Sequence, residues 1–276
     1  MPPSATAPVL CYHRIGGPLE LGVTRVGRSV FERQMRTLAE AGWRTLSLAQ
    51  FARALPTPRA PRPFLLTFDD GYASLAEHAY PVLAALGFTA TTFLITDFVG
   101  GTNSWDVRYT WRRLQHLDWP EIERWRARGF EFASHGAAHR RLTWLDERAA
   151  ADELGRSRET LVQRLGPKAG MAVAYPFGAA DQRVERLAAA AGYELGFGGV
   201  RGNAGSRLHL PRVPVYMWDV GDTPFGLRGD RLGAVGTFAA HLANRCAVGT
   251  SIMRGLGARG SGSSSDPRPE PPAPSP

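Results

Sequence analysis

Short apolar runs alternate with longer amphipathic segments over most of the chain, and this alternation limits the possible folds more than any other feature. The apolar runs have the length and residue content of buried strands, and the segments between them have the 3.6-residue periodicity of helices. Strands and helices that alternate in this way form parallel βαβ units, whose sheet is covered on both faces. We therefore expect an α/β fold, built as a barrel or as a doubly wound sheet. Strands are predicted at residues 8–12, 43–46, 64–68, 89–95, 130–133, 171–175 and 194–197. Helices are predicted at 29–41, 48–55, 121–128, 146–165 and 181–191, and a further helix is predicted to end near 86. An extended segment is predicted at 208–217.

The composition excludes a wholly disordered chain, because 43% of the 276 residues are apolar and 21% are charged. No run approaches the roughly 18 consecutive apolar residues of a membrane span, so we expect no stable membrane insertion. Residues 1–8 lack the basic and apolar regions of a secretion signal, and we expect a cytoplasmic protein.

The net charge of +8 does not indicate a nucleic-acid partner. Every basic residue except Lys168 is arginine, and the arginines are scattered rather than gathered into a basic arm. Cys11 and Cys246 lie far apart and form no CxxC motif, so neither a disulfide scaffold nor a thiolate zinc site is expected.

We expect three regions along the chain. Residues 1–225 carry the alternating pattern and form the barrel domain, and residues 226–255 form an extension to which the pattern assigns no structure. Residues 256–276 are rich in Gly, Ser and Pro and too poor in apolar residues to offset the entropy of folding, so we expect a disordered tail.

Two adjacent carboxylates, Asp69 and Asp70, follow the predicted strand at 64–68. The carboxyl ends of parallel strands carry the reacting groups of many α/β proteins. Neighbouring residues point in different directions, so one carboxylate can bind a metal while the other acts on water. The structural alternative is a helix N-cap followed by the turn glycine Gly71.

Two histidines, His135 and His139, follow the predicted strand at 130–133. Histidines four residues apart can converge on one ion, and imidazoles suit zinc, cobalt, nickel or iron. Because both motifs follow strands of one parallel sheet, Asp70 and the histidines are expected to meet at the same edge of that sheet.

Three further segments place chemistry at this edge. The turn at 175–178 contains Tyr175, Pro176 and Phe177, which could wall a groove or simply pack on the core. His13 follows the first strand and is a candidate general acid, and His209 in the late extended segment is a second candidate. Trp105, Trp111, Trp119 and Trp144 lie in or near loops, where aromatic rings can stack on sugars or pack in the core.

The motifs Thr67-Phe68-Asp69-Asp70-Gly71-Tyr72, His135-Gly136-Ala137-Ala138-His139 and Tyr175-Pro176-Phe177-Gly178 together resemble those of the polysaccharide deacetylases with a NodB homology domain, carbohydrate esterase family 4. The segments 9–15 and 210–214 resemble further stretches of the same family, so the resemblance covers roughly residues 8–220. It implies a distorted (β/α) barrel with fewer than eight strands.

The resemblance also implies an activity: removal of N-acetyl groups from amino sugars with one divalent metal ion, often zinc, with cobalt or nickel as alternatives. Asp69 would be the base, Asp70, His135 and His139 the metal ligands, and the backbone amide of Tyr175 would help to bind the oxyanion. The implied partner is a carbohydrate: an N-acetylated amino sugar, glycan or glycolipid. The residues implied in binding it are Tyr72, Pro176, Phe177 and Trp105.

The sequence departs from the family pattern at three places. Gly136 replaces the usual Ser or Thr after the first histidine, so the loop around the metal is expected to be less rigid than usual. Ala174 replaces the usual arginine, so Asp69 is expected to lack its orienting partner. There is no C-terminal Leu-x-His segment, but the variant with an N-terminal Tyr-His-Arg strand takes its acid from that strand. His13 is therefore our first choice as proton donor and His209 the second.

Two other functions fit the same residues. A deformylase, or an amidase with a non-polymeric substrate, would keep the fold and change the scissile group. A catalytically silent carbohydrate-binding module is the third possibility, supported by the missing arginine and opposed by the complete Asp-His-His set.

Overall fold

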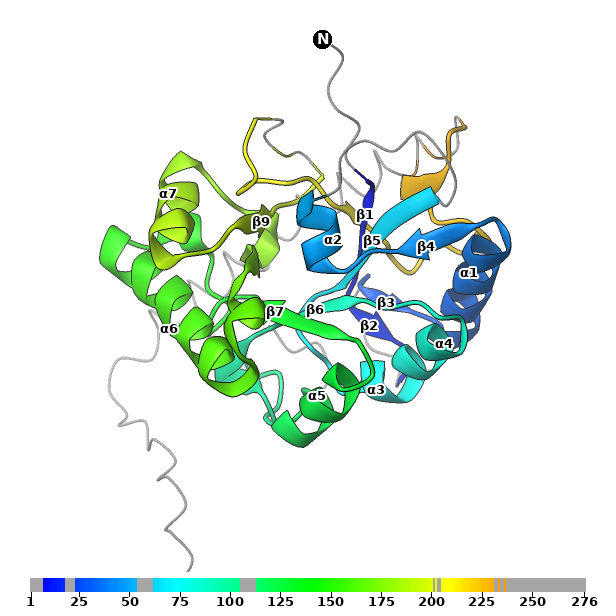
Figure 1. Cartoon of the computed structure of the whole chain (residues 1–276), viewed down its shortest axis with the longest axis horizontal. Coiled ribbons are helices and arrows are strands. Elements are labelled where there is room, and N and C mark those ends of the chain that lie inside the picture. Colours follow the sequence, from blue (N-terminus) through cyan, green and yellow to red (C-terminus); the bar gives the residue numbers. More distant parts are fainter. Residues whose placement is uncertain are drawn as a thin grey trace, which may run out of the picture.

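The computed structural model describes residues 7–17, 23–53, 62–104, 113–200, 202, 205–230, 233 and 236. A curved sheet forms its centre, and most helices pack around the outside, while the short helix α2 (Leu48–Arg53) packs on the inner side (Figure 1). The main path of the sheet is β10-β1-β5-β6-β7-β8-β9, with β4 paired to the first half of β5, and all these pairings are parallel. The main path has seven strands, and β4 is an eighth that pairs only beside β5, so the curled path is shorter than that of a complete (β/α) barrel and the predicted distorted barrel is confirmed. The strands are β1 (Val9–Tyr12), β4 (Trp43–Thr45), β5 (Arg62–Phe68), β6 (Thr91–Leu94), β7 (Glu131–Ser134), β8 (Ala172–Ala174), β9 (Leu195–Phe197) and β10 (Val213–Pro214).

The helices follow the strands as the alternating pattern predicts. Aspartates at 118, 146 and 181 accept backbone N–H bonds at the starts of three of them, as expected for N-cap residues. The helices are α1 (Arg28–Glu40), α2 (Leu48–Arg53), α3 (Ser74–His78), α4 (Tyr80–Ala85), α5 (Trp119–Arg126), α6 (Glu147–Leu165) and α7 (Gln182–Ala191). The 3₁₀ turns are η1 (Thr96–Phe98), η2 (Leu142–Trp144), η3 (Pro167–Gly170), η4 (Pro176–Gly178) and η5 (Phe225–Leu227). A separate two-stranded ribbon consists of β2 (Arg14–Ile15) and β3 (Arg25–Val26). Within the described ranges, no helix has the length and apolar content that a membrane span requires.

Residues 207–212 connect the two edges of the sheet. Gly196 in β9 donates to Arg207 O and accepts from Leu210 N, so this segment runs alongside β9. The chain then continues into β10, which pairs with β1. The segment therefore closes the curve, and side chains on it can reach the interior of the barrel.

Alternate residues of each strand face opposite sides of the sheet. In β5, Phe64, Leu66 and Phe68 pack in the cluster that includes buried residues of α1, α3 and α4. Leu65 instead packs in a second cluster with residues of β1 and of β6 to β9. Asp69 continues the alternation of Leu65 and therefore lies on the inner side of the curve.

The structure differs from the sequence-based expectation in two local features, and one further expectation stays untested. The helix expected to end near residue 86 is two helices, α3 and α4, because Pro81 lacks an N–H and suits the first turn of a new helix. Of the extended segment at 208–217, only β10 is a strand. The assignments for the extension at 226–255 and the tail at 256–276 fall almost entirely outside the described residues.

Candidate active site

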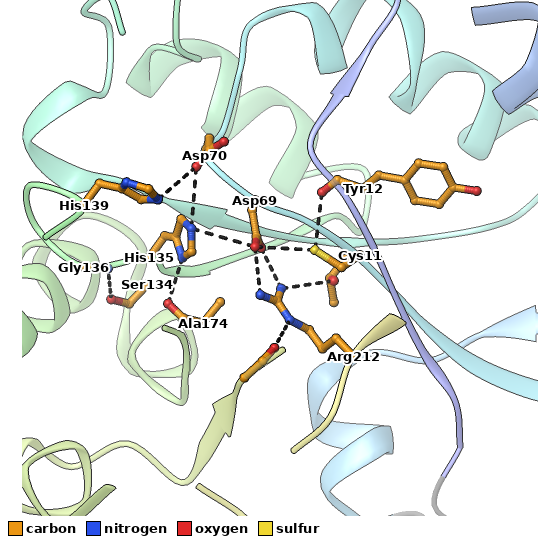
Figure 2. A network of polar contacts seen from close by, with 12 residues as sticks. Cys11, Tyr12, Asp69, Asp70, Ser134, His135, Gly136, His139, Ala174 and Arg212 are labelled. Atoms are coloured by element: carbon orange, nitrogen blue, oxygen red, sulfur yellow. Dashed lines mark hydrogen bonds and ion pairs between the residues drawn. The ribbon is translucent and has the colours of Figure 1, made fainter. Parts of the chain in front are cut away.

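The two motifs that follow β5 and β7 meet at the carboxyl edge of the sheet (Figure 2). Asp70 Oδ1 lies 3.5 Å from Nε2 of His135 and 3.5 Å from Nε2 of His139. All three side chains are buried, and their nearest ligand atoms lie within 4.8 Å of one another. The two adjacent aspartates point in different directions, as expected from the sequence: Asp70 faces the histidines, and Asp69 faces Arg212.

The arrangement of Asp70, His135 and His139 fits a divalent metal ion. Ligand atoms about 2.0–2.1 Å from a tetrahedral zinc ion lie about 3.4 Å from one another, close to the spacing seen here. His135 Nδ1 donates to Ala174 O at 2.8 Å, which leaves Nε2 as the acceptor facing Asp70. Burial lowers the pKa of His135, and the ring is therefore neutral, as a metal ligand must be.

The backbone is strained at this edge. Asp70, His139 and Phe177 have positive φ angles of 68°, 55° and 62°, and they are the described non-glycine residues in this region of conformational space. Such conformations cost about 1–3 kcal/mol each and cluster at functional sites. His116 supports one of them, since its Nδ1 donates to the backbone oxygen of Asp70 at 2.8 Å.

Arg212 holds Asp69 with two hydrogen bonds, from Nη1 to Oδ1 at 2.6 Å and from Nη2 to Oδ2 at 2.8 Å. Both side chains are buried, with exposed fractions of 3% for Asp69 and 4% for Arg212. Burial alone would raise the pKa of Asp69, but the charge and hydrogen bonds of Arg212, together with His135 and His13, outweigh it and hold the pKa well below its usual range. Asp69 is therefore a fixed carboxylate.

The expectation that Asp69 lacks an arginine partner is wrong. Ala174 does replace the usual arginine, but Arg212 reaches the same carboxylate from the segment that closes the barrel. The sequence placed Arg212 in the stretch at 210–214 and did not reveal its contact. Only the closure between β9 and β1 brings it to Asp69.

The structure separates the two candidate proton donors. His13 is partly buried beside Asp69, and one ligand atom each of Cys11, His13 and Asp69 lie within 4.8 Å of one another. Burial lowers the pKa of His13 to about 4, so its ring is neutral at neutral pH. His209 instead pairs with Glu185 of α7, Nδ1 to Oε1 at 3.0 Å. This arrangement favours His13 over His209.

The residues of the turn after β8 have different surroundings. Phe177 packs on His139, with ring centroids 4.7 Å apart, and Pro176 is buried in η4. Tyr175 faces away from Asp69: its ring is buried between β8 and the helices α6 and α7, and its hydroxyl donates to Leu208 O. The backbone N–H of Tyr175 donates to Phe197 O at 2.9 Å, a bond with which an oxyanion would have to compete. Its role in oxyanion binding stays a prediction.

The two other residues predicted to bind substrate are Tyr72 and Trp105. Tyr72 is buried and stacks on His116, with ring centroids 5.1 Å apart. Trp105 lies outside the described residues. His116 itself was not recognised in the sequence, because its segment carries no motif and only the folded chain places the ring under Asp70.

A curled parallel sheet that carries an Asp-His-His set and a second carboxylate at its carboxyl edge defines a protein of the NodB type. The chain belongs to the polysaccharide deacetylase family, whose model matches residues 57–196.

Individual relatives agree with the family assignment. The chain is 28% identical to YxkH of Bacillus subtilis over 194 residues, which are 70% of this chain and 64% of that protein. It is 26% identical to poly-beta-1,6-N-acetyl-D-glucosamine N-deacetylase of Staphylococcus aureus over 182 residues, 62% of this chain and 60% of the relative. The chain thus spans somewhat less than two thirds of both curated relatives. The fold matches that of a Streptococcus pyogenes deacetylase solved with acetate, with a TM-score of 0.68, 24% identity, and coverage of 81% of this chain and 97% of the other.

Proposed function

We propose that this protein is a metal-dependent hydrolase that removes the acetyl group from an N-acetylated amino sugar of a glycan. The observation that carries the proposal is the position of Asp69, whose Oδ2 lies 3.8 Å from Nε2 of His135 in the buried Asp-His-His set. A carboxylate that lies beside a set of metal ligands without belonging to it is an arrangement that activates water.

Asp70, His135 and His139 would hold the divalent ion. When bound, the ion would polarise the acetyl carbonyl and make water more acidic. Asp69 accepts the proton of the attacking water, while Arg212 keeps the carboxylate in one orientation. A proton from His13 completes the departure of the amine, so that water and amide become acetate and free amino sugar. Because the resting His13 is neutral, the proton that it passes to the amine is the one that Asp69 takes from the attacking water and hands on to His13.

Zinc is the ion that we propose first, since one carboxylate and two imidazoles with an open position are a typical zinc set, and cobalt or nickel would fit the same ligands. The name of the Staphylococcus aureus relative makes poly-N-acetylglucosamine the first substrate to try. The cytoplasmic location and the absence of a nucleic-acid partner stay predictions.

The test joins metal analysis of the purified protein by mass spectrometry with acetate release from N-acetylglucosamine oligomers. About one ion per chain together with acetate release would support the proposal. Bound metal with release of formate but not acetate would favour a deformylase. Failure to bind zinc, cobalt or nickel would overturn the proposal in favour of the silent binding module, although that possibility has lost its main support because Asp69 has its arginine.

The two histidine candidates can be separated by substitution. We expect His13→Ala to lower kcat about 100-fold or more, the usual contribution of a general acid, with metal content unchanged. His209→Ala is the matched comparison and should keep most of the activity, since His209 pairs with Glu185. Steady-state kinetics and metal analysis of both variants make the measurement, and the reverse ranking would assign the proton to His209.

An exposed aromatic ring is connected to the site through two intervening side chains. Trp144 in η2 is 52% exposed, and the guanidinium of Arg141 lies 5.0 Å from the centre of its ring. The same guanidinium lies 6.0 Å from the ring of Phe177, which packs on His139. Trp144 is therefore the outermost ring of a series that begins at the candidate metal ligand His139. In this position its exposed face would bind a sugar unit of the same glycan at some distance from the reacting one.

For Trp144→Ala we expect a KM that is about 3- to 10-fold higher on long N-acetylglucosamine oligomers, equivalent to about 0.5–1.5 kcal/mol of lost stacking. Activity on the disaccharide should be unchanged. Trp144→Phe keeps an aromatic face and should behave nearly like the parent protein. An equal loss on long and short substrates would contradict a platform of this kind.

A further inference from the structure

The loop at residues 135–140, called here the histidine loop, presents two of the three candidate metal ligands. It follows β7 and turns sharply, with φ angles of 80° at Gly136 and 55° at His139. The backbone of η1 holds two of its carbonyls: Thr96 N donates to Gly136 O and Asp97 N donates to Ala137 O. Its N–H groups need acceptors from elsewhere.

Glu153 of α6 is one such acceptor. Its Oε1 accepts from the backbone N–H of Ala138 at 2.7 Å and of Arg140 at 3.2 Å. These two amides flank His139, so one carboxylate oxygen fixes the chain on both sides of a candidate ligand.

Glu153 stands out on the buried face of its helix. That face consists of Ala150, Glu153, Leu154, Ser157, Leu161 and Leu165. Glu153 is only 2% exposed, and burial raises its pKa while its bonds to the amides of Ala138 and Arg140 oppose this change. A carboxylate on an apolar stripe is unfavourable unless its hydrogen bonds are satisfied, and here the histidine loop satisfies them.

The other polar member of the stripe faces the same loop. The hydroxyl of Ser157 contacts the hydroxyl of Ser134 at 2.7 Å, and Ser134 Oγ accepts from Gly136 N at 3.2 Å. Two positions one turn apart on α6 thus support the loop, Glu153 directly and Ser157 through Ser134.

Gly136 leaves the space that Glu153 occupies. A Cβ atom at position 136 would lie 3.0 Å from Glu153 Oε1, and a side chain there would also be strained at a φ of 80°. The position that usually carries Ser or Thr in the resembling family is therefore closed here by the carboxylate itself.

We propose that Glu153 is a positioning residue for the metal site: it anchors the histidine loop from α6 and replaces the loop hydroxyl that Gly136 lacks. The inference rests on the proposed function only in taking His135 and His139 as metal ligands. It predicts that the affinity for metal, and not only the stability of the fold, depends on the carboxylate oxygen of Glu153.

The experiment measures zinc affinity of the full-length apoprotein by competition with a chromogenic chelator, and needs no turnover. Glu153→Leu should weaken zinc binding about 10- to 100-fold, as expected when an outer-shell partner is lost. Glu153→Gln keeps an oxygen acceptor for both amides and should stay within about 3-fold of the parent protein. Glu159→Leu, at an exposed glutamate of the same helix, is the matched control and should change nothing.

A second comparison tests whether Glu153 takes the place of a side chain at position 136. Gly136→Ser should reduce zinc affinity more in the parent protein than in the Glu153→Ala background, because the clash is with the carboxylate. Equal losses of zinc affinity in both backgrounds would overturn the inference that Glu153 takes the place of a side chain at position 136.

A folded Glu153→Leu protein with parental zinc affinity but lower thermal stability would overturn the positioning role and leave the proposed function intact. If Glu153→Leu weakens zinc binding as expected but the parent protein releases acetate from no sugar, the inference would be supported and the proposed function contradicted.

Discussion

Replacing Arg212 with alanine should lower kcat for acetate release by at least about 100-fold while the protein keeps its metal. Arg212 makes the two short hydrogen bonds that orient Asp69, and both groups are buried. Without the guanidinium, burial raises the pKa of the Asp69 carboxyl, and the side chain is free to turn away from the water that it must deprotonate. Removal of one partner from a buried ion pair also destabilises a protein by about 3–5 kcal/mol.

Because that loss of stability affects folding as well as chemistry, Arg212→Lys is measured beside Arg212→Ala. Lysine keeps the charge but not the planar pair of donors, so the Arg212→Lys protein should fold normally and still lose most of its activity. Arg207→Ala, at an exposed arginine of the same closing segment, is the control and should retain parental kcat. Parental activity in a folded Arg212→Lys protein would mean that Asp69 does not need a fixed orientation.

Asp69→Asn and His135→Ala should both abolish turnover and differ in metal content. Asn cannot accept the proton of water, so we expect a loss of about 100- to 10,000-fold in kcat with roughly one ion still bound. His135→Ala removes a ligand from the Asp-His-His set, and we expect the loss of both metal and activity. The two results together separate the base from the ligands.

The measurement is metal content by mass spectrometry beside acetate release for both purified variants. His78→Ala is the control, since His78 lies on α3 and contacts Glu77 rather than the site. If Asp69→Asn retained most of the parental activity, another group would be the base. If His135→Ala kept its metal, the ligand set would be different.

A further contact surrounds Asp69, the base that we propose. The thiol of Cys11 lies 3.4 Å from Asp69 Oδ2, the oxygen that also accepts from Arg212 Nη2. The carboxylate is thus surrounded by donors, which keep it ionised and at the same time make it a weak base. In the mechanism that we propose, its reaction with water would therefore depend on a metal ion in the neighbouring site to make that water acidic.

The alternation of strands and helices was readable in the sequence because each strand needs an apolar run and each helix needs its 3.6-residue stripe. The caps at Asp146 and Asp181, which the sequence analysis did not name, are also local, since an N-cap bonds to an amide three residues later. The meeting of Asp70 with His135 and His139 also followed from the sequence, because parallel strands end at the same edge of a sheet. These parts depend on chemistry within a few residues or on a general rule of topology.

The contacts of Arg212, Glu153 and His116 could not be predicted in this way. Each joins segments far apart in the chain: Arg212 reaches Asp69 across the closure of the barrel, Glu153 reaches the histidine loop from α6, and His116 lies under Asp70. Which side of β8 Tyr175 faces was undecided for the same reason. The sequence by itself determined the elements, the family and the edge at which the reactive groups meet. Only the tertiary structure decided which charged groups orient them, because those contacts depend on how the closed sheet and its helices pack in three dimensions.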